Sequence, residues 1–459
     1  MIDLIGIAIG IAIGIAIAIG IAIGIAALFS RGRKAVPRPA HSAALVTALQ
    51  IAHPLFCGRR SRRRETRNQK SGVPVSHYSL FVIRYSLSFA LLFTACRPAP
   101  PVPLRLEWPT MGTIAAVQCA DTAAAPQARD IAQRTFQALD NELSAWNPAS
   151  TLSAVNAAAG TPQPVAVSSN FATVLQAALT YCADTEGAFN PLIGPVMQAW
   201  GFNGVPRPIR PADEDLAALL TRTRWHDVHL ATGAQTTVRL ATPGMKLDLG
   251  AIAKGYAVDV AWERLKAAGH TNLLIDLGGN LRALGEAAPE RGGWRTGVRN
   301  PFQSNALVGK FLMHDGEAVA TSGNYERFVE IDGLRYAHIM DGRTGQPVAG
   351  MAGVTVIAPD AMTADALSTA LFILGPQRGV ALLRAWPGCE ALWIPDTPDQ
   401  LTLLATPGFA TRLTPVGNTP YRLTVLTGEE PESTRPPLSP VPAGQEKKGV
   451  APWVPPNKP

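Results

Sequence analysis

The sequence has few cysteines for its length, and their spacing argues against two classes of protein. The 459 residues contain five cysteines, none of them in a Cys-x-x-Cys pair or at the spacing of zinc ligands. A small disulfide-bonded framework and a structural zinc site are therefore not expected. The eight histidines are scattered, so they give no indication of a His/Cys metal centre either.

An excess of positive charge is missing from most of the chain. The formal net charge is +7, but residues 1–75 alone hold eleven Lys/Arg and two Asp/Glu, so the remainder carries a net charge of −2. A nucleic-acid-binding domain needs a basic surface that neutralises backbone phosphates. The near-neutral body therefore predicts no nucleic-acid partner.

The first 75 residues lack the pattern of a folded core. Residues 4–29 are almost entirely Ile, Gly and Ala in a short repeat. Such a run is long enough to cross a bilayer, at about 1.5 Å per residue, but its low complexity is also typical of translated repetitive DNA. Five arginines follow between positions 59 and 64. We interpret residues 1–75 as a low-complexity, basic extension that need not belong to the mature protein.

A secretory signal is predicted at residues 76–96. Arg84 precedes the apolar run 85–95, which ends at Cys96. A charged start, a short apolar segment and a small residue before a cysteine are typical of a signal whose cysteine becomes lipidated. Phe93 stands where such signals usually have leucine, so simple secretion and an uncleaved anchor remain alternatives. Four prolines indicate a tether at 97–103.

Helical and strand patterns alternate irregularly between residues 104 and 427. Mixed blocks without regular βαβ alternation favour an α+β domain over a doubly wound sheet. Residues 428–459 are rich in Pro, Glu and Ser and are expected to form a disordered tail. Periodicity predicts helices over 123–143, 171–185, 213–221, 256–268 and 363–374, strands within 225–240 and over 273–275, 281–284, 295–299, 318–321, 328–331, 354–357 and 391–394, and a final hairpin within 401–427.

The junction at residues 246–259 has the composition of a ligand site. Asp248, Gly250, Ala251 and Lys254 fall where an apolar strand-like segment gives way to a helical pattern. Small residues let the backbone approach a phosphate, helix N–H groups point at it, and a lysine adds positive charge. An ordinary turn with a solvated lysine would have the same composition, so this stretch alone leaves both interpretations open.

Other stretches have residue types suited to chemistry. Residues 187–202 form a Gly/Pro-rich loop with aromatics, and residues 275–282 read as two strands joined by Gly-Gly. His338, near Asp341 and Arg343, is suited to proton transfer beside an anionic ligand. Asp365 and Thr369 lie one helical turn apart on one face, as oxygen ligands of Mg²⁺ could. The alternatives are a buried aromatic cluster, an ordinary hairpin, a structural histidine and a helix cap.

Taken together and in this order, these stretches resemble the ApbE family of FAD:protein FMN transferases. The resemblance covers roughly residues 104–426. It implies an α+β flavin transferase fold, with mixed and antiparallel sheets and flanking helices around a central FAD cleft. No single motif is decisive, but eight in a fixed order are specific. The motifs are 111–113 (Met-Gly-Thr), 143–156, 187–202, 248–259, 277–279 (Leu-Gly-Gly), 320–323 (Ala-Thr-Ser-Gly), 338–347 and 363–369.

The resemblance also implies a reaction and the residues that perform it. FAD would lie in the cleft with Mg²⁺ at its pyrophosphate, and a protein hydroxyl would attack the FMN phosphorus as AMP leaves. The implied metal ligands are Asp365, Thr369 and the backbone carbonyl of Ala251, and His338 would assist deprotonation of the acceptor. The implied flavin-nucleotide contacts are Met111, Trp146, Ala188, Phe189, Asn190, Asp248 and Lys254.

The resemblance further implies a protein partner and a location. The acceptor would carry a Thr or Ser in a Ser-Gly-Ala-Thr-like motif, as a membrane redox-complex subunit or an extracytoplasmic flavoprotein. Together with the signal, this predicts a lipoprotein anchored in the bacterial periplasm. Asn190 stands where many relatives have aspartate, which removes a charge from the flavin pocket.

Two alternative functions use the same cleft. One is Mg²⁺-dependent hydrolysis of FAD to FMN and AMP, with water as the acceptor. The other is a non-catalytic FAD-binding lipoprotein. The presence of Asp365, Thr369 and His338 argues against the latter, because storage needs neither a metal nor a proton acceptor.

Overall fold

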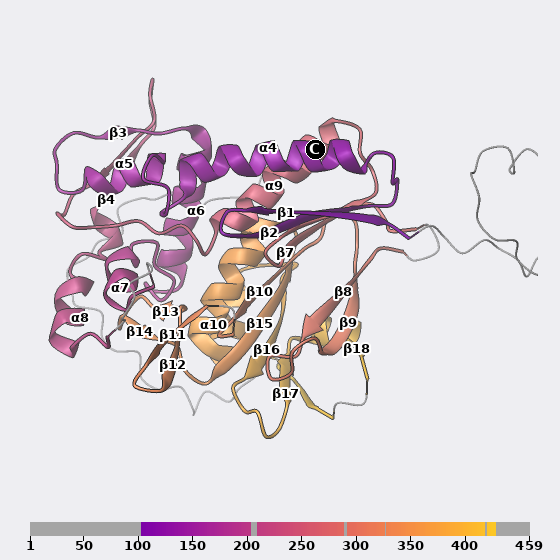
Figure 1. Ribbon diagram of the computed structural model, residues 1–459. Helices are drawn as coiled ribbons and strands as arrows, with labels where there is room; N and C mark the ends of the chain where they lie inside the picture. Colours follow the sequence, from indigo (N-terminus) through magenta and orange to yellow (C-terminus); the bar gives the residue numbers. More distant parts are fainter. Residues whose placement is uncertain (1–101, 203–208, 289–291, 326, 418–419, 428–459) are drawn as a thin grey trace, which may run out of the picture. The chain divides into compact units, whose positions relative to one another are not determined.

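The computed structural model describes residues 102–202, 209–288, 292–325, 327–417 and 420–427 (Figure 1). The extension 1–75, the predicted signal 76–96, most of the tether 97–103 and the tail 428–459 lie outside these residues. The predictions made for those segments, including lipidation at Cys96, therefore stay predictions.

A nine-stranded sheet forms the centre of the described domain. Neighbouring strands are antiparallel except for the last pair, β17 and β19, which is parallel. In spatial order the strands are β1 (Leu104–Thr110), β2 (Thr113–Cys119), β6 (Leu273–Leu277), β7 (Asn280–Leu284), β10 (Ala318–Gly323), β15 (Met351–Ala358), β16 (Glu390–Pro395), β17 (Thr402–Ala405) and β19 (Arg422–Val425).

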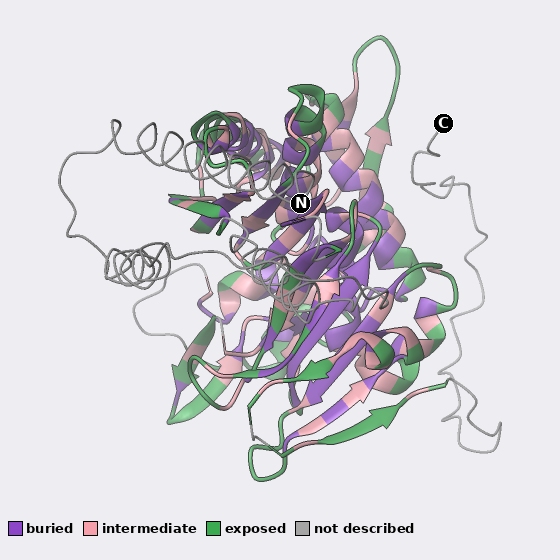
Figure 2. Cartoon of the chain, turned by 90° about the vertical axis from the view of Figure 1, so that its right-hand side faces the viewer, coloured by how far each residue is buried: buried purple, intermediate pink, exposed green. Residues whose placement is uncertain are grey.

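Three helices cover one face of this sheet. They are α4 (Ala125–Leu143), α9 (Ala253–Ala267) and α10 (Ala361–Leu383). Helix α4 packs on β1 and β2, α9 on β6 and β7, and α10 on β10 and β15 (Figure 1). Apolar side chains from both layers form the main core. Figure 2 shows that the centre of the domain is largely buried. Strand β15 is buried along its whole length, whereas the edge strand β19 is exposed.

A second layer packs on the other face of the sheet. It consists of the strands β8 (Trp294–Arg299), β9 (Leu307–Met313) and β18 (Thr414–Pro415) together with the helix α11 (Pro407–Arg412). Phe311 of β9 contacts Phe409 of α11, with ring centroids 5.3 Å apart. Both rings belong to a core that includes Val319 and Leu392 of the large sheet.

The remaining elements are mostly short and pair largely with one another. A small third cluster joins Trp200, Leu216 and Ile331. The elements are α5 (Thr151–Ala157), α6 (Ser169–Asp184), α7 (Gly194–Ala199), α8 (Asp213–Leu220), the 3₁₀ turn η2 (Trp225–Asp227), and the short strands β3 (Val165–Ala166), β4 (Val228–Ala231), β5 (Thr237–Leu240), β11 (Phe328–Ile331), β12 (Leu334–Ala337), β13 (Met340–Asp341) and β14 (Gln346–Pro347).

The predicted α+β class is confirmed, and so are most long elements. The expected C-terminal hairpin is wrong: β17 and β19 run parallel, because the chain between them crosses to the second layer, where Thr414 pairs with Lys310. The range of α10 contains two helical segments, which meet at a kink at Gly375 and Pro376, where Gly375 has φ 71°. The predicted end of the helix at residue 374 coincides with this kink. A glycine followed by proline usually ends a helix.

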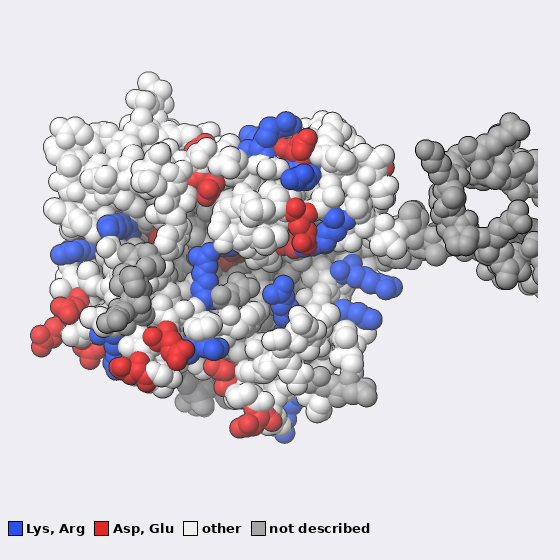
Figure 3. All heavy atoms as spheres, in the orientation of Figure 1, with Lys and Arg blue, Asp and Glu red and all other residues white. Residues whose placement is uncertain are grey.

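Helix α10 is a core helix. Of the described residues, only this helix is long and apolar enough to cross a membrane, but it packs on β10, β15 and α9 instead. Its apolar composition therefore reflects burial on several sides. On the face seen in Figure 3, Lys/Arg and Asp/Glu side chains are interspersed among neutral ones, in keeping with the near-neutral charge of this part of the chain.

Candidate active site

The turn before α9 is fixed by Asp248. Its side-chain Oδ1 accepts a hydrogen bond of 2.8 Å from the backbone N–H of Gly250, which is a local turn typical of aspartate. The backbone N–H of Asp248 donates to the carbonyl of Pro191 at 2.7 Å. The junction is thereby tied to the loop at 187–193, as a shared site requires.

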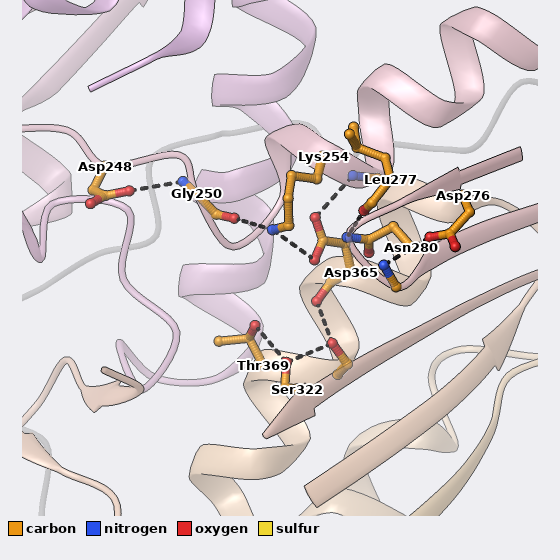
Figure 4. Close-up of polar contacts among 12 residues, drawn as sticks. Asp248, Gly250, Lys254, Asp276, Leu277, Asn280, Ser322, Asp365 and Thr369 are labelled. Carbon is orange, nitrogen blue, oxygen red and sulfur yellow. Dashed lines mark hydrogen bonds and ion pairs between the residues drawn. The ribbon is translucent and has the colours of Figure 1, made fainter. Parts of the chain in front are cut away.

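Lys254 and Asp365 meet at the start of α9. The Lys254 Nζ donates to the Gly250 carbonyl at 2.7 Å and lies 3.6 Å from Asp365 Oδ1, between the two groups in Figure 4. The backbone N–H of Gly255 donates to Asp365 Oδ2 at 2.9 Å. Two residues 111 positions apart in the sequence, Lys254 and Asp365, thus share one small polar site between α9 and α10.

Burial of the charged Asp365 carboxylate in this position costs desolvation free energy. It is 5% exposed, and burial raises its pKa above the ordinary value, against the opposing effects of Lys254 and the Gly255 N–H. A buried carboxylate with one cation at 3.6 Å is incompletely compensated. A second positive charge at this carboxylate would therefore be stabilised.

A second carboxylate holds the two helices together. Asp259 of α9 accepts hydrogen bonds from the N–H groups of Ala361 and Met362, both at 2.8 Å, at the start of α10. It also pairs with Arg282 of β7 at 2.7 Å. Burial raises the pKa of Asp259 to about 7, and Arg282 opposes this. All its oxygen contacts are internal, so we assign Asp259 to structure and not to ligand binding.

Hydroxyl groups of β10 and α10 meet below Asp365. Ser322 Oγ lies 2.8 Å from Ser368 Oγ and 3.2 Å from Thr369 Oγ1. Ser368 Oγ donates to the Asp365 carbonyl at 2.9 Å. The structure thus places Thr369 beside Asp365, as helical spacing predicts (Figure 4).

The loop residues Ala188, Phe189 and Asn190 mostly make contacts within the protein itself. The side chains of Ala188 and Phe189 are buried, and the Ala188 carbonyl accepts from the Gly342 N–H at 2.9 Å. Asn190 donates from Nδ2 to the Thr223 carbonyl at 3.0 Å and accepts from the Leu192 N–H at 2.9 Å. The amide therefore closes the loop. Its two contacts need both a donor and an acceptor, which an ionised aspartate could not supply.

The β1–β2 turn carries Met111. It has φ 45°, in the left-handed region that few residues other than glycine adopt. Residues 109–114 line a shallow, open depression at this turn. Trp146 is the other predicted flavin contact in the N-terminal part. Its side chain is 61% exposed, and its backbone N–H donates a local hydrogen bond to Ser144 Oγ. The structure does not bring Trp146 into contact with the other predicted site residues.

His338 is held by Arg327 and not by Asp341. The Nδ1 of His338 lies 3.1 Å from the Arg327 carbonyl. A carbonyl only accepts, so Nδ1 carries the proton and Nε2 offers its lone pair. Asp341 and Arg343, expected beside His338, pair with each other at 2.6 Å. The hydrogen-bond partner of His338 is therefore Arg327, while Asp341 and Arg343 pair with each other.

Arg327 was missed by the sequence reasoning. Its Nη2 donates to the Gly112 carbonyl at 3.2 Å, so it links His338 to the β1–β2 turn. No local pattern marks an exposed arginine beside a short strand. The contact joins residues 215 positions apart, which only the tertiary structure can show.

His338 is expected to stay neutral well below neutral pH. Burial lowers its pKa to about 4, and the positive charges of Arg327 and Lys254 act in the same direction. A depressed histidine pKa means that the unfolded chain binds more protons between about pH 6.5 and 4, so this group favours folding less as pH falls through that window. An NMR titration of His338, assigned with His338→Gln, should show no protonation near pH 6. A midpoint near 6.5 would contradict this environment.

Comparison with known proteins assigns the chain to a family. The model of the ApbE family matches residues 111–393. A FAD:protein FMN transferase of Treponema pallidum is 39% identical over 302 residues, which cover 62% of this chain and 83% of that protein. A transferase of the same name from Vibrio cholerae is 33% identical, over 65% of this chain and 90% of that one.

Solved structures agree with this assignment. The flavin transferase ApbE from Vibrio cholerae superposes with a TM-score of 0.60 at 31% identity, over 68% of this chain and 100% of that chain. The ApbE protein from Thermotoga maritima gives 0.58 at 30% identity, over 64% and 94% of the two chains. The chain therefore belongs to the ApbE family.

Proposed function

We propose that this chain transfers FMN from FAD to a Ser or Thr hydroxyl of an acceptor protein and releases AMP. The observation that carries the proposal is the convergence of Lys254, the Gly255 N–H and Asp365 at the start of α9, in a member of a family whose relatives are named FAD:protein FMN transferases. Phosphoryl-type transfer needs positioning and neutralisation of charge, which these groups provide.

The residues present fit Mg²⁺. Asp365 offers a buried, incompletely compensated carboxylate, and Thr369 offers a hydroxyl one turn away. The Gly255 N–H donates to the Asp365 side chain, and not to the Ala251 carbonyl one turn earlier. Among the described residues, no backbone N–H donates to the Ala251 carbonyl. All three ligands are oxygens, which Mg²⁺ prefers.

The ligand set is incomplete without substrate. Among the described residues, no group of three or more His, Cys, Asp or Glu could hold a metal ion. Mg²⁺ commonly binds one or two carboxylates and completes its shell with water and substrate phosphates. When bound, it would neutralise charge that develops on the pyrophosphate.

The chain's own groups account for the other parts of the reaction. The acceptor oxygen bonds to the FMN phosphorus, the bond from that phosphorus to the bridging oxygen breaks, and AMP takes the electron pair. His338 Nε2 accepts the hydroxyl proton, because its Nδ1 is already protonated and its low pKa keeps the ring neutral. Lys254 places a positive charge beside the pyrophosphate. Met111 and Asp248 lie on the two turns that would border the nucleotide.

One assay separates transfer from its alternatives. The purified full-length chain is incubated with FAD, Mg²⁺ and a peptide containing a Ser-Gly-Ala-Thr motif, and products are read by mass spectrometry. We expect the peptide to gain the mass of FMN with release of AMP, and a Thr→Ala peptide to gain none. Free FMN without an adduct would identify a hydrolase instead. Unchanged FAD would identify a flavin-binding protein without this activity.

The acceptor and the location are parts of the same proposal. The predicted signal at 76–96 and the tether at 97–103 support a periplasmic lipoprotein that acts on an extracytoplasmic or membrane flavoprotein. The mass of the amino-terminal peptide of the mature chain tests this. A diacylated Cys96 supports anchoring, whereas an unmodified mature terminus elsewhere contradicts it.

A further inference from the structure

Three hydroxyls connect β10 to the face of α10 that carries Asp365 and Thr369. Ser322 Oγ lies between Ser368 Oγ, at 2.8 Å, and Thr369 Oγ1, at 3.2 Å. Ser368 Oγ donates to the Asp365 carbonyl at 2.9 Å. The direction of each hydrogen bond in this chain follows from counting protons, because each hydroxyl has only one.

The count starts from the carbonyl, which can only accept. The Ser368 hydroxyl donates its only proton to the Asp365 carbonyl, so it must accept a hydrogen bond from Ser322. Ser322 then has no proton left for its second neighbour, and Thr369 must donate to Ser322. The opposite direction would remove the hydrogen bond from Ser368 to the Asp365 carbonyl and fill a lone pair of Thr369. The first arrangement satisfies all three contacts.

The orientation of Thr369 depends on this acceptor. A threonine in a helix divides between two rotamers, because its hydroxyl can also donate to a carbonyl one turn earlier. Here that carbonyl, of Asp365, already accepts from Ser368. Ser322 gives the Thr369 proton a different acceptor, and the lone pairs of Thr369 Oγ1 are left available.

We propose that Ser322 is a positioning residue for the metal: it accepts the Thr369 proton and so directs the Thr369 lone pairs toward the cation at Asp365. The inference rests on the proposed function only through the ligand roles of Asp365 and Thr369. Groups that orient a metal ligand in this way typically change metal affinity about 10-fold to 100-fold when removed.

A matched control comes from a second hydroxyl pair, between β10 and the neighbouring strand β15. Thr321 Oγ1 and Thr355 Oγ1 are 3.0 Å apart and pair across β10 and β15. Successive residues of a strand point to opposite faces, so this pair points away from the face where Ser322 meets α10. Thr355→Val removes one buried hydroxyl of similar size without touching Thr369.

The test measures Mn²⁺ binding to the full-length chain by electron paramagnetic resonance. We expect Ser322→Ala to weaken Mn²⁺ binding about 10-fold, Ser322→Thr to stay near wild type, and Thr355→Val to leave binding unchanged. In the transfer assay, Ser322→Ala should need more Mg²⁺ and recover its rate at high Mg²⁺. Should Ser322→Ala not fold, Ser322→Cys takes its place, because a thiol is a poorer acceptor of similar shape.

The outcomes separate this inference from the proposed function. Unchanged Mn²⁺ affinity in Ser322→Ala overturns the positioning role, whether or not the wild type transfers FMN. If Mn²⁺ affinity depends on Ser322 but the wild type transfers no FMN, only the proposed reaction is overturned. Equal weakening in Thr355→Val would show a general packing effect and also overturn the positioning role.

Discussion

Asp365→Asn is expected to reduce Mg²⁺-dependent transfer roughly 1,000-fold while the fold survives. Loss of a charged metal ligand removes several kcal/mol of charge stabilisation, and about 4 kcal/mol corresponds to that factor. The asparagine oxygen can still accept from the Gly255 N–H, which the carboxylate does now. Because burial disfavours the charged carboxylate, the neutral variant should be at least as stable as the wild type.

Two measurements check this expectation. Initial rates of FMN transfer over a range of Mg²⁺ concentrations report the loss of turnover, and thermal unfolding reports stability. Asp130→Asn, which removes an exposed carboxylate from α4, serves as the control and should match wild type in both. Wild-type turnover by Asp365→Asn at all Mg²⁺ concentrations would remove Asp365 from the metal site.

Gly255→Ala should destabilise the domain by about 3 kcal/mol and lower Tm by roughly 6 °C. A Cβ at this position would lie 2.1 Å from the Ala361 carbonyl oxygen and 2.7 Å from the Asp365 Cβ. The first contact is backbone, so no side-chain rotation relieves it, and α9 must move away from α10. Transfer should fall as well, because the Gly255 N–H and Lys254 move with the helix.

Gly233→Ala is the matched control for this substitution. Its Cβ would meet nothing within 4 Å, and the expected change is within about 0.5 kcal/mol. Differential scanning calorimetry of the three proteins without ligand measures the effect. Equal Tm values for Gly255→Ala and wild type would mean that the two helices can separate without cost, contrary to their close packing.

The sequence by itself determined the local features of the site. The order of strand and helix patterns predicted an α+β domain, and small residues before a helical pattern predicted a turn suited to a ligand at residues 246–259. The spacing of Asp365 and Thr369 placed a carboxylate and a hydroxyl on one helix face. The last two conclusions depend on residues within about one or two turns of each other, where backbone geometry alone fixes relative position.

Only the tertiary structure decided which groups meet. Gly255 donates to Asp365 across 110 positions, Ser322 reaches Thr369 across 47, and Arg327 holds both His338 and the β1–β2 turn. The parallel pairing of β17 with β19 was likewise invisible to local patterns. Such contacts are set by strand pairing and by the packing of two helices on one sheet. Periodicity shows which face of an element is apolar, but it does not show which partner will cover that face.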